Sequence, residues 1–224
     1  MESVVQLRSA VALLGRFPAL AGVDLDVSAG EILLVRGPNG AGKTSLLRVC
    51  AGLLPVTSGI ARVLGVDVVA DRAAVRRDVG LLGHESCLYR DLSVSENIEF
   101  WARAAGAARS DAAAALARVG VATRLVDLAV HRLSTGQRRR VSIAAMIVRR
   151  PRLWLLDEPH AGLDTDGRDL VDGLMVEAAT SGASVMFASH EIDRAAAVAH
   201  RSATIVGGAI AGGAIVSGDR ADRP

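Results

Sequence analysis

Eight residues with the spacing Gly-x-x-x-x-Gly-Lys-Thr have the clearest chemistry in the sequence. They run from Gly37 to Thr44, between an apolar run at 32–35 and a helix-like stretch at 45–50. Glycines in such a loop let backbone N–H groups surround a phosphate, and the following helix points its positive end at the same anion. The lysine can reach the β- and γ-phosphate oxygens, and the threonine hydroxyl can hold Mg²⁺. The pattern predicts a nucleoside triphosphate site formed by Gly37, Pro38, Asn39, Gly40, Ala41, Gly42, Lys43, Thr44 and Ser45.

Lysine usage singles out the same position. Lys43 is the only lysine, and the other cations in the Lys+Arg total of 26 are arginines. A compact ammonium fits inside a phosphate cradle where a planar guanidinium does not. A guanine-reading Asn-Lys-x-Asp motif needs another lysine, so the sequence excludes a GTPase of that kind.

A second element for metal and water chemistry is an apolar run that ends in two carboxylates. Residues 153–156 are followed by Asp157, Glu158 and Pro159. The Asp157 carboxylate can help to hold Mg²⁺ through water, and Glu158 can accept a proton from the water that attacks the γ-phosphate. A strand with this ending is more often an ordinary turn when it stands alone, but after a phosphate-binding loop the catalytic interpretation is favoured.

Bulk properties limit the classes of protein. A chain of 224 residues makes one domain with room for a modest subdomain, and a net charge of +2 gives no basic field for nucleic acid. Cys50 and Cys87 lack metal-like spacing and lie in apolar sequence, which predicts reduced, buried thiols in a cytosolic protein. Charges interrupt every candidate membrane span, so we expect any membrane role to act through a partner.

The elements that would position these residues alternate along the chain. Strand patterns occur at 4–7, 11–14, 23–28, 32–35, 60–64, 79–82, 153–156 and 184–188, and short strands and turns are expected at 203–218 around paired glycines. Helical patterns occur at 92–130, opened by a capping box at Ser93 and broken at Gly106 and Gly120, at 134–150 before Pro151, and at 169–179. Strands that end in charged residues and alternate with helices predict an open parallel sheet with its site at the strand carboxyl ends.

Three further motifs follow in order. The sequence Leu133-Ser-Thr-Gly-Gln137 resembles the LSGGQ signature of ATP-binding cassette (ABC) proteins, with threonine in place of the first glycine. Ser134 and the N–H groups of a helix start can bind a terminal phosphate, although Ser-x-x-Gln is also a plain helix cap. Residues 161–164 match the D-loop of that family, and His190 matches its switch histidine. The resemblance covers the chain from about residue 4 to residue 216.

The resemblance implies an α/β fold: a P-loop NTPase cassette with a RecA-like core, an N-terminal antiparallel β subdomain and an inserted helical subdomain. Residues 1–224 would form one ABC ATP-binding domain, with the helical subdomain at about 85–150. It also implies an ATPase that uses ATP and Mg²⁺ and pairs head to tail with a second copy. Separate transmembrane permease subunits would hold it at the cytoplasmic, inner face of the cell membrane, with no nucleic acid partner. The residues implied to act across that pair are Ser134, Gly136, Gln137 and Asp164, facing Lys43 and Glu158.

Two positions depart from the family pattern. His84 stands where the family has a glutamine that senses Mg²⁺ and the γ-phosphate, and Glu85 or another residue is the alternative. Phe17 is the candidate for stacking on adenine, but the alignment also allows Leu14.

Residues 82–84, 133–140 and 153–159 are similar to one branch of the family, the ATP-binding subunits of the haem exporter of cytochrome c maturation. Alternatives are the ATPase of another exporter of drugs or small molecules, a soluble ABC ATPase acting on DNA or ribosomes, and an unrelated P-loop kinase. A P-loop kinase would not have the LSGGQ-like signature that this sequence has before Asp157. DNA-repair cassettes have long coiled-coil insertions, and translation cassettes usually occur in pairs, neither of which is found here.

Overall fold

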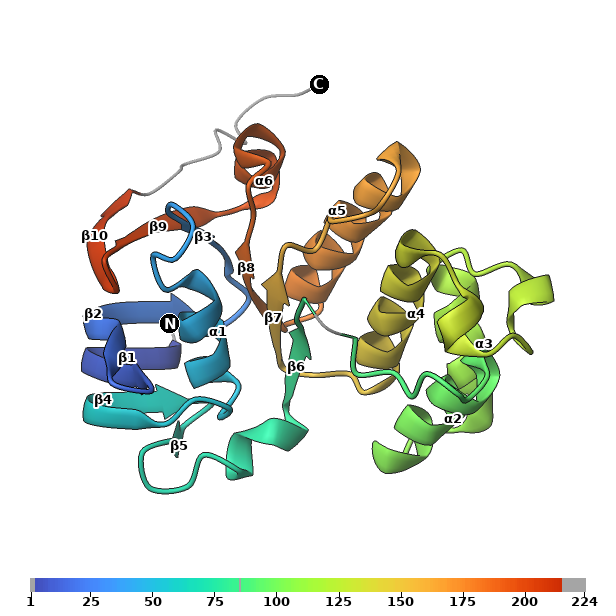
Figure 1. Ribbon diagram of the computed structural model, residues 1–224, viewed down its shortest axis with the longest axis horizontal. Coiled ribbons are helices and arrows are strands. Elements are labelled where there is room, and N and C mark those ends of the chain that lie inside the picture. Colours follow the sequence, from blue (N-terminus) through green and yellow to red (C-terminus); the bar gives the residue numbers. More distant parts are fainter. Residues whose placement is uncertain (1–2, 85, 215–224) are drawn as a thin grey trace.

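Two β-sheets organise the chain in the computed structural model, which describes residues 3–84 and 86–214 (Figure 1). The first sheet is antiparallel and has the strand order β2-β1-β4-β5. Its strands are β1 (Ser3–Leu14), β2 (Phe17–Ser28), β4 (Val56–Val63) and β5 (Val66–Asp67). The two strands expected at 4–7 and 11–14 form one long strand, because a bulge near Ser9, with φ of 44°, carries the pairing through.

The second sheet has the order β10-β9-β3-β8-β7-β6, and its five strands from β9 to β6 run parallel. It contains β3 (Ile32–Arg36), β6 (Val79–Leu82), β7 (Leu153–Asp157), β8 (Ser184–Ala188), β9 (Arg201–Val206) and β10 (Ala209–Ala214). The carboxyl ends of the parallel strands meet at one edge, as expected for an open α/β sheet. The predicted α/β class is confirmed.

The helices are α1 (Lys43–Cys50), α2 (Val94–Ala104), α3 (Arg109–Arg118), α4 (Thr135–Val148), α5 (Thr165–Thr180) and α6 (Ile192–Val198). Short 3₁₀ turns occur at η1 (Ala74–Arg77), η2 (Thr123–Leu125) and η3 (Val130–Arg132). Helices α2, α3 and α4 pack on one another beside β6 and β7 (Figure 1). The capping box predicted at Ser93 is present, so local sequence sets the start of α2.

Each central strand is buried on both faces and divides the interior into two cores. In β3, Leu33 and Val35 pack into the core that contains α1 and the antiparallel sheet. Ile32 and Leu34 pack into the core that contains α2 to α5. Because side chains alternate along a strand, α1 and α4 cover opposite faces of the parallel sheet.

Several expected boundaries are wrong. Helix α5 begins at Thr165 rather than 169, because the Asp164 carboxylate accepts from Gly167 N at 3.0 Å and caps it. Helix α4 ends at Val148 rather than 150, because Arg150 has a left-handed φ of 49°.

Two sequence interpretations also need correction. The predicted glycine turn at 212–213 lies instead within β10, at an irregularity in its pairing with β9, and residues beyond 214 lie outside the described residues. Cys50 is buried as predicted, but Cys87 is exposed, because it lies in the loop after β6 rather than in a packed element. Glu85, the alternative to His84, also lies outside the described residues.

Candidate nucleotide-binding and hydrolysis site

The glycine-rich loop joins β3 to α1, and its backbone tolerates no side chain at two glycines. Gly37 and Gly42 have φ of 148° and 112°. A Cβ at Gly37 would lie 2.2 Å from the Ile205 carbonyl oxygen, and one at Gly42 would lie 2.6 Å from that of Ala19. Both positions therefore require glycine, for conformation and for space.

Lys43 begins α1 and lies inside the curl of the loop. Its side chain is 7% exposed, and Nζ donates to the carbonyl oxygens of Gly37 at 2.8 Å and Pro38 at 3.0 Å. The ammonium is thus held by the loop backbone at the positive end of the helix. This arrangement suits an anionic phosphate.

Thr44 and Asp157 bring two oxygen groups together across the sheet edge. Thr44 Oγ1 donates to Asp157 Oδ2 at 2.7 Å, which joins α1 to the end of β7. Hydroxyl and carboxylate oxygens are hard ligands that suit Mg²⁺, which commonly takes one or two protein ligands plus phosphate oxygens. Among the described residues no cluster of three or more His, Cys, Asp or Glu side chains could hold a metal, so any Mg²⁺ here would depend on such a mixed shell.

Glu158 and His190 face each other at the ends of β7 and β8. Glu158 has φ of 49°, a left-handed conformation that is costly for a residue with a Cβ. The backbone N–H of His190 donates to Glu158 Oε2 at 3.1 Å, and His190 Nε2 lies 3.3 Å from Oε1. Glu158 Oε1 is a buried atom without a hydrogen-bond partner among the described residues. The approach of His190 Nε2 to it is therefore close but lacks hydrogen-bond geometry.

One cavity of about 460 Å³ brings most of the predicted site together. Phe17 and Leu14, the two adenine candidates, both line one part of it and are 79% and 49% exposed. His84 lines the same cavity. The other predicted residues in its lining are Asn39, Gly40, Gly42, Lys43, Thr44, Ser45, Asp157, Glu158 and His190.

The signature and D-loop residues are absent from that lining. Ser134 and Gln137 form a capping box, in which Ser134 Oγ accepts from Gln137 N at 3.2 Å and Gln137 Oε1 accepts from Ser134 N at 2.8 Å. Gly136 contacts the D-loop, since a Cβ there would lie 2.7 Å from the Gly162 carbonyl oxygen. Asp164 caps α5 and pairs with Arg140 at 3.0 Å, and these contacts lower the pKa of its carboxyl. Within one chain, all four predicted signature and D-loop residues have structural partners on the α4 side of the sheet.

The sequence is similar to those of known proteins over most of its length. The model of a family described as ABC transporter matches residues 20–161. A relative from Bradyrhizobium diazoefficiens, named cytochrome c biogenesis ATP-binding export protein CcmA, is 41% identical over 188 residues, or 82% of this chain and 90% of the relative. A protein named CcmA 2 from Cupriavidus metallidurans is 38% identical over 85% of this chain and 90% of its own length.

The chain belongs to the ABC transporter family. Solved cassettes share its fold: the dimeric post-hydrolysis structure of MJ0796 with ADP and Pi superposes with a TM-score of 0.84 at 24% identity, covering 96% of this chain and 99% of that one. A structure described as the ATP-binding subunit of an ABC transporter reaches a TM-score of 0.87 at 21% identity over 95% of this chain and 90% of that one. The protein is thus an ATP-binding and ATP-hydrolysing subunit of an ABC transporter. No helix within residues 3–84 and 86–214 has the length and apolar character needed to cross a membrane.

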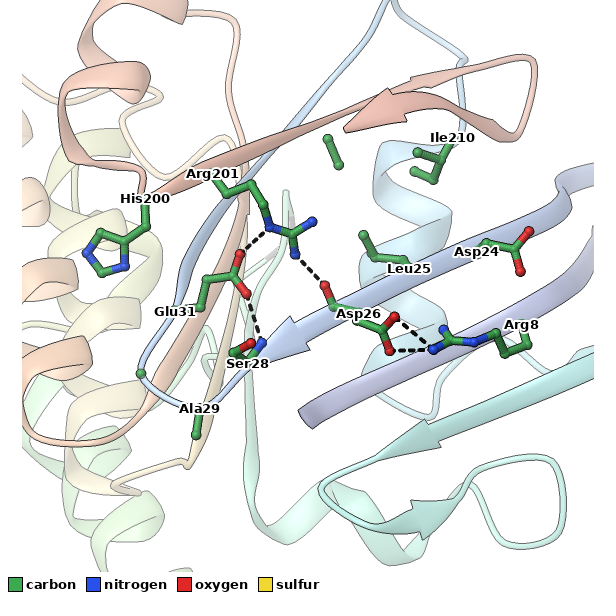
Figure 2. Close-up of a pocket in the computed structure, with 12 residues that line it drawn as sticks. Arg8, Asp24, Leu25, Asp26, Ser28, Ala29, Glu31, His200, Arg201 and Ile210 are labelled. Atoms are coloured by element: carbon green, nitrogen blue, oxygen red, sulfur yellow. Dashed lines mark hydrogen bonds and ion pairs between the residues drawn. The ribbon is translucent and has the colours of Figure 1, made fainter. Parts of the chain in front are cut away.

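A larger hollow of about 940 Å³ lies elsewhere on this cassette, between β2 and β9 (Figure 2). Four of its charges form two pairs, Arg8 with Asp26 at 2.8 Å and Arg201 with Glu31 at 2.6 Å, and the Asp24 carboxylate accepts a hydrogen bond from Ser9 N at 2.9 Å. None of the predicted site residues lines it. Its size alone therefore gives no reason to place the ATPase chemistry there.

Sequence reasoning missed one residue at the site. Arg139, on α4, directs its guanidinium at the backbone behind Asp157 and Glu158. Its only signal in the sequence is the run of three arginines after Gln137, and nothing in that run distinguishes the inward-pointing member from its neighbours.

Proposed function

We propose that this cassette powers an exporter serving cytochrome c biogenesis, with haem as the transported molecule. The export role is supported by relatives at 38–43% identity that bear this name and align over most of the chain. The assignment of residues to the ATPase chemistry is supported by one observation, the cavity that gathers Lys43, Thr44, Asp157, Glu158 and His190 at the strand ends.

ATP would bind with its triphosphate in the loop and its adenine against Phe17. Lys43 and the N-terminus of α1 would neutralise phosphate charge, which favours binding and the transition state. Thr44 and Asp157 would hold Mg²⁺, which would supply positive charge to offset that of the triphosphate. Glu158 would accept a proton from the attacking water, and His190, fixed beside it, would contact the γ-phosphate.

The active form would be a head-to-tail pair. Ser134 and Gly136 lie at the start of α4, which packs on the opposite face of the sheet from α1. A second copy could present these residues to the open side of the cavity, so that each ATP lies between the loop of one copy and the signature of the other. Hydrolysis would remove the ligand that joins the two copies and reopen the pair.

The membrane subunits would dock near the helices that follow His84. Tyr89 and Phe100 form an edge-to-face pair, with ring centroids 5.0 Å apart, and remain 49% and 37% exposed. Exposed aromatics of this kind suit a protein partner. We place the cassette at the cytoplasmic, inner face of the membrane through this contact. A solved neighbour, CbiO1 from Clostridium perfringens, is described as part of the transporter complex CbiONQ, with 25% identity and a TM-score of 0.79.

The test is removal of the chain from its native cell, followed by measurement of covalently bound haem in c-type cytochromes. Return of the wild type should restore them, and Lys43→Ala should not. Arg48→Ala changes an exposed residue on the same helix and is the matched control, which should restore them fully. Normal c-type cytochromes in cells without the chain would contradict this cargo and favour another exporter of small molecules.

A further inference from the structure

Arg139 lies on α4 five residues after Ser134, and its side chain reaches into the sheet edge where β6 and β7 end. Nη1 donates to the Gly83 carbonyl oxygen at 2.7 Å. Nη2 donates to the carbonyl oxygens of Asp157, at 2.8 Å, and Glu158. Nε donates to the carbonyl oxygen of Pro159 at 3.3 Å. One guanidinium thus engages the backbone after two neighbouring strands.

These four carbonyls belong to the backbone that holds the reacting groups. Three are consecutive, and the central one belongs to Glu158, whose left-handed φ of 49° needs support from outside the residue. The fourth, Gly83, directly precedes His84, which lines the nucleotide cavity. Since peptide orientation fixes the direction of the next Cβ, the contacts of Arg139 set where Glu158 and His84 point.

The chemistry of the contact is specific to arginine. A guanidinium has five N–H donors in a rigid plane and no acceptor, so it can face a group of carbonyl oxygens without repulsion. Lysine has a single nitrogen and cannot span the same set, and glutamine would bring its own oxygen against them. Burial lowers the pKa of Arg139 to about 10, against the opposing effect of Asp157 and Glu158, so the group stays protonated at neutral pH.

We infer that Arg139 is a positioning residue for ATP hydrolysis, which orients Glu158 and His84 through their backbone and connects them to the helix that carries the signature. The inference rests on the proposed ATPase role of Glu158. Arg139 does not contact the cavity that receives the nucleotide, so its loss should reduce turnover while ATP binding persists.

The matched control is Arg149, at the other end of the same helix. It too is partly buried and donates to backbone carbonyls, those of Arg76 at 2.9 Å and Val79 at 3.2 Å. These carbonyls lie before and at the start of β6, at the opposite end of that strand from Gly83. Arg149→Gln should therefore lower stability without changing the catalytic geometry.

The experiment compares kcat, KM and ATP affinity of the purified wild type with those of Arg139→Gln, Arg139→Lys and Arg149→Gln. Misplacement of a catalytic group by about 1 Å costs on the order of 100-fold in rate. We expect kcat to fall about 10- to 100-fold for Arg139→Gln and less for Arg139→Lys, with ATP affinity within about threefold of wild type. Arg139→Lys keeps the charge and provides a folded variant if Arg139→Gln does not fold.

A double variant separates positioning from general loss of structure. If Arg139 acts through Glu158, adding Arg139→Gln to Glu158→Gln should lower the residual hydrolysis rate by a much smaller factor than Arg139→Gln lowers the wild-type rate, and that smaller factor reports the part that acts through His84. Equal turnover of Arg139→Lys, Arg149→Gln and wild type would contradict the inferred role of Arg139 but not the proposed function. Fully additive rate losses in the double variant would contradict the same inference. A wild type that binds ATP but never hydrolyses it would instead contradict the proposed function.

Discussion

Phe17→Ala tests where adenine lies, because two side chains line the same part of the cavity. The Phe17 ring is 79% exposed, so an adenine stacked on it would cover surface that is now free. A phenylalanine exposes roughly 200 Å² when free, and covering about a third of it, at about 25 cal/mol per Å², stabilises the complex by about 1.5 kcal/mol. Base stacking on aromatic side chains is measured at about 1–3 kcal/mol, which agrees with this estimate.

We therefore expect Phe17→Ala to raise the dissociation constant of ATP about tenfold. Isothermal titration with ATP and with inorganic tripolyphosphate is the assay, because tripolyphosphate has no base and its affinity should not change. Leu14→Ala is the matched control, since Leu14 lines the same region and is 49% exposed. A tenfold loss in Leu14→Ala with none in Phe17→Ala would refute the stacking assignment, and an equal loss for tripolyphosphate would show that Phe17 supports the loop instead.

Four further outcomes are expected. Gly136→Ala should lower the free energy of unfolding by about 1–3 kcal/mol in urea, because its Cβ would lie 2.7 Å from the Gly162 carbonyl oxygen; an unchanged midpoint would contradict this close approach. Asn97→Ala should lower the free energy of unfolding by about 2–3 kcal/mol in the same assay, because the fully buried Asn97 amide both donates to and accepts from the backbone before α2. A decrease below about 0.5 kcal/mol would be inconsistent with these hydrogen bonds. A thiol reagent at pH 8 should label Cys87 quickly and Cys50 only after unfolding, because burial raises the pKa of Cys50 from 9.0 to about 12. Since folded Cys50 keeps its proton where the unfolded thiol loses it, its contribution to stability should fall as pH rises from about 9 to 12.

Local signals in the sequence predicted much of the fold. The loop at 37–44 and the capping box at Ser93 lie as expected, because glycine conformation and cap hydrogen bonds depend on residues a few positions apart. Strands β6 and β8 also match their predicted ranges, since strands buried on both faces read as apolar runs.

Other features depend on contacts between distant segments. The exposure of Cys87 depends on which loops other segments leave uncovered. The start of α5 at Thr165 is different, because the Asp164 cap that sets it is a local signal. The left-handed backbone of Glu158 is supported by a hydrogen bond from Arg139, and the same bond holds the Arg139 side chain inward. The two residues are far apart in the sequence, so no local pattern predicts either feature. The ordered motifs predicted Lys43, Asp157 and Glu158, which the fold brings to one cavity, whereas the contacts that orient these side chains required the structure.

The molar mass of Glu158→Gln in Mg²⁺ and ATP tests most directly whether two copies build one ATP site. Removal of the general base should slow hydrolysis about 10²- to 10⁴-fold, so that the ATP-bound state persists. Light scattering after gel filtration should show the 23.2 kDa chain moving to twice that mass with ATP retained. Addition of Ser134→Arg should return it to 23.2 kDa while ATP still binds. A Glu158→Gln chain that binds ATP and remains at 23.2 kDa, or a pair that Ser134→Arg leaves intact, would contradict the composite site.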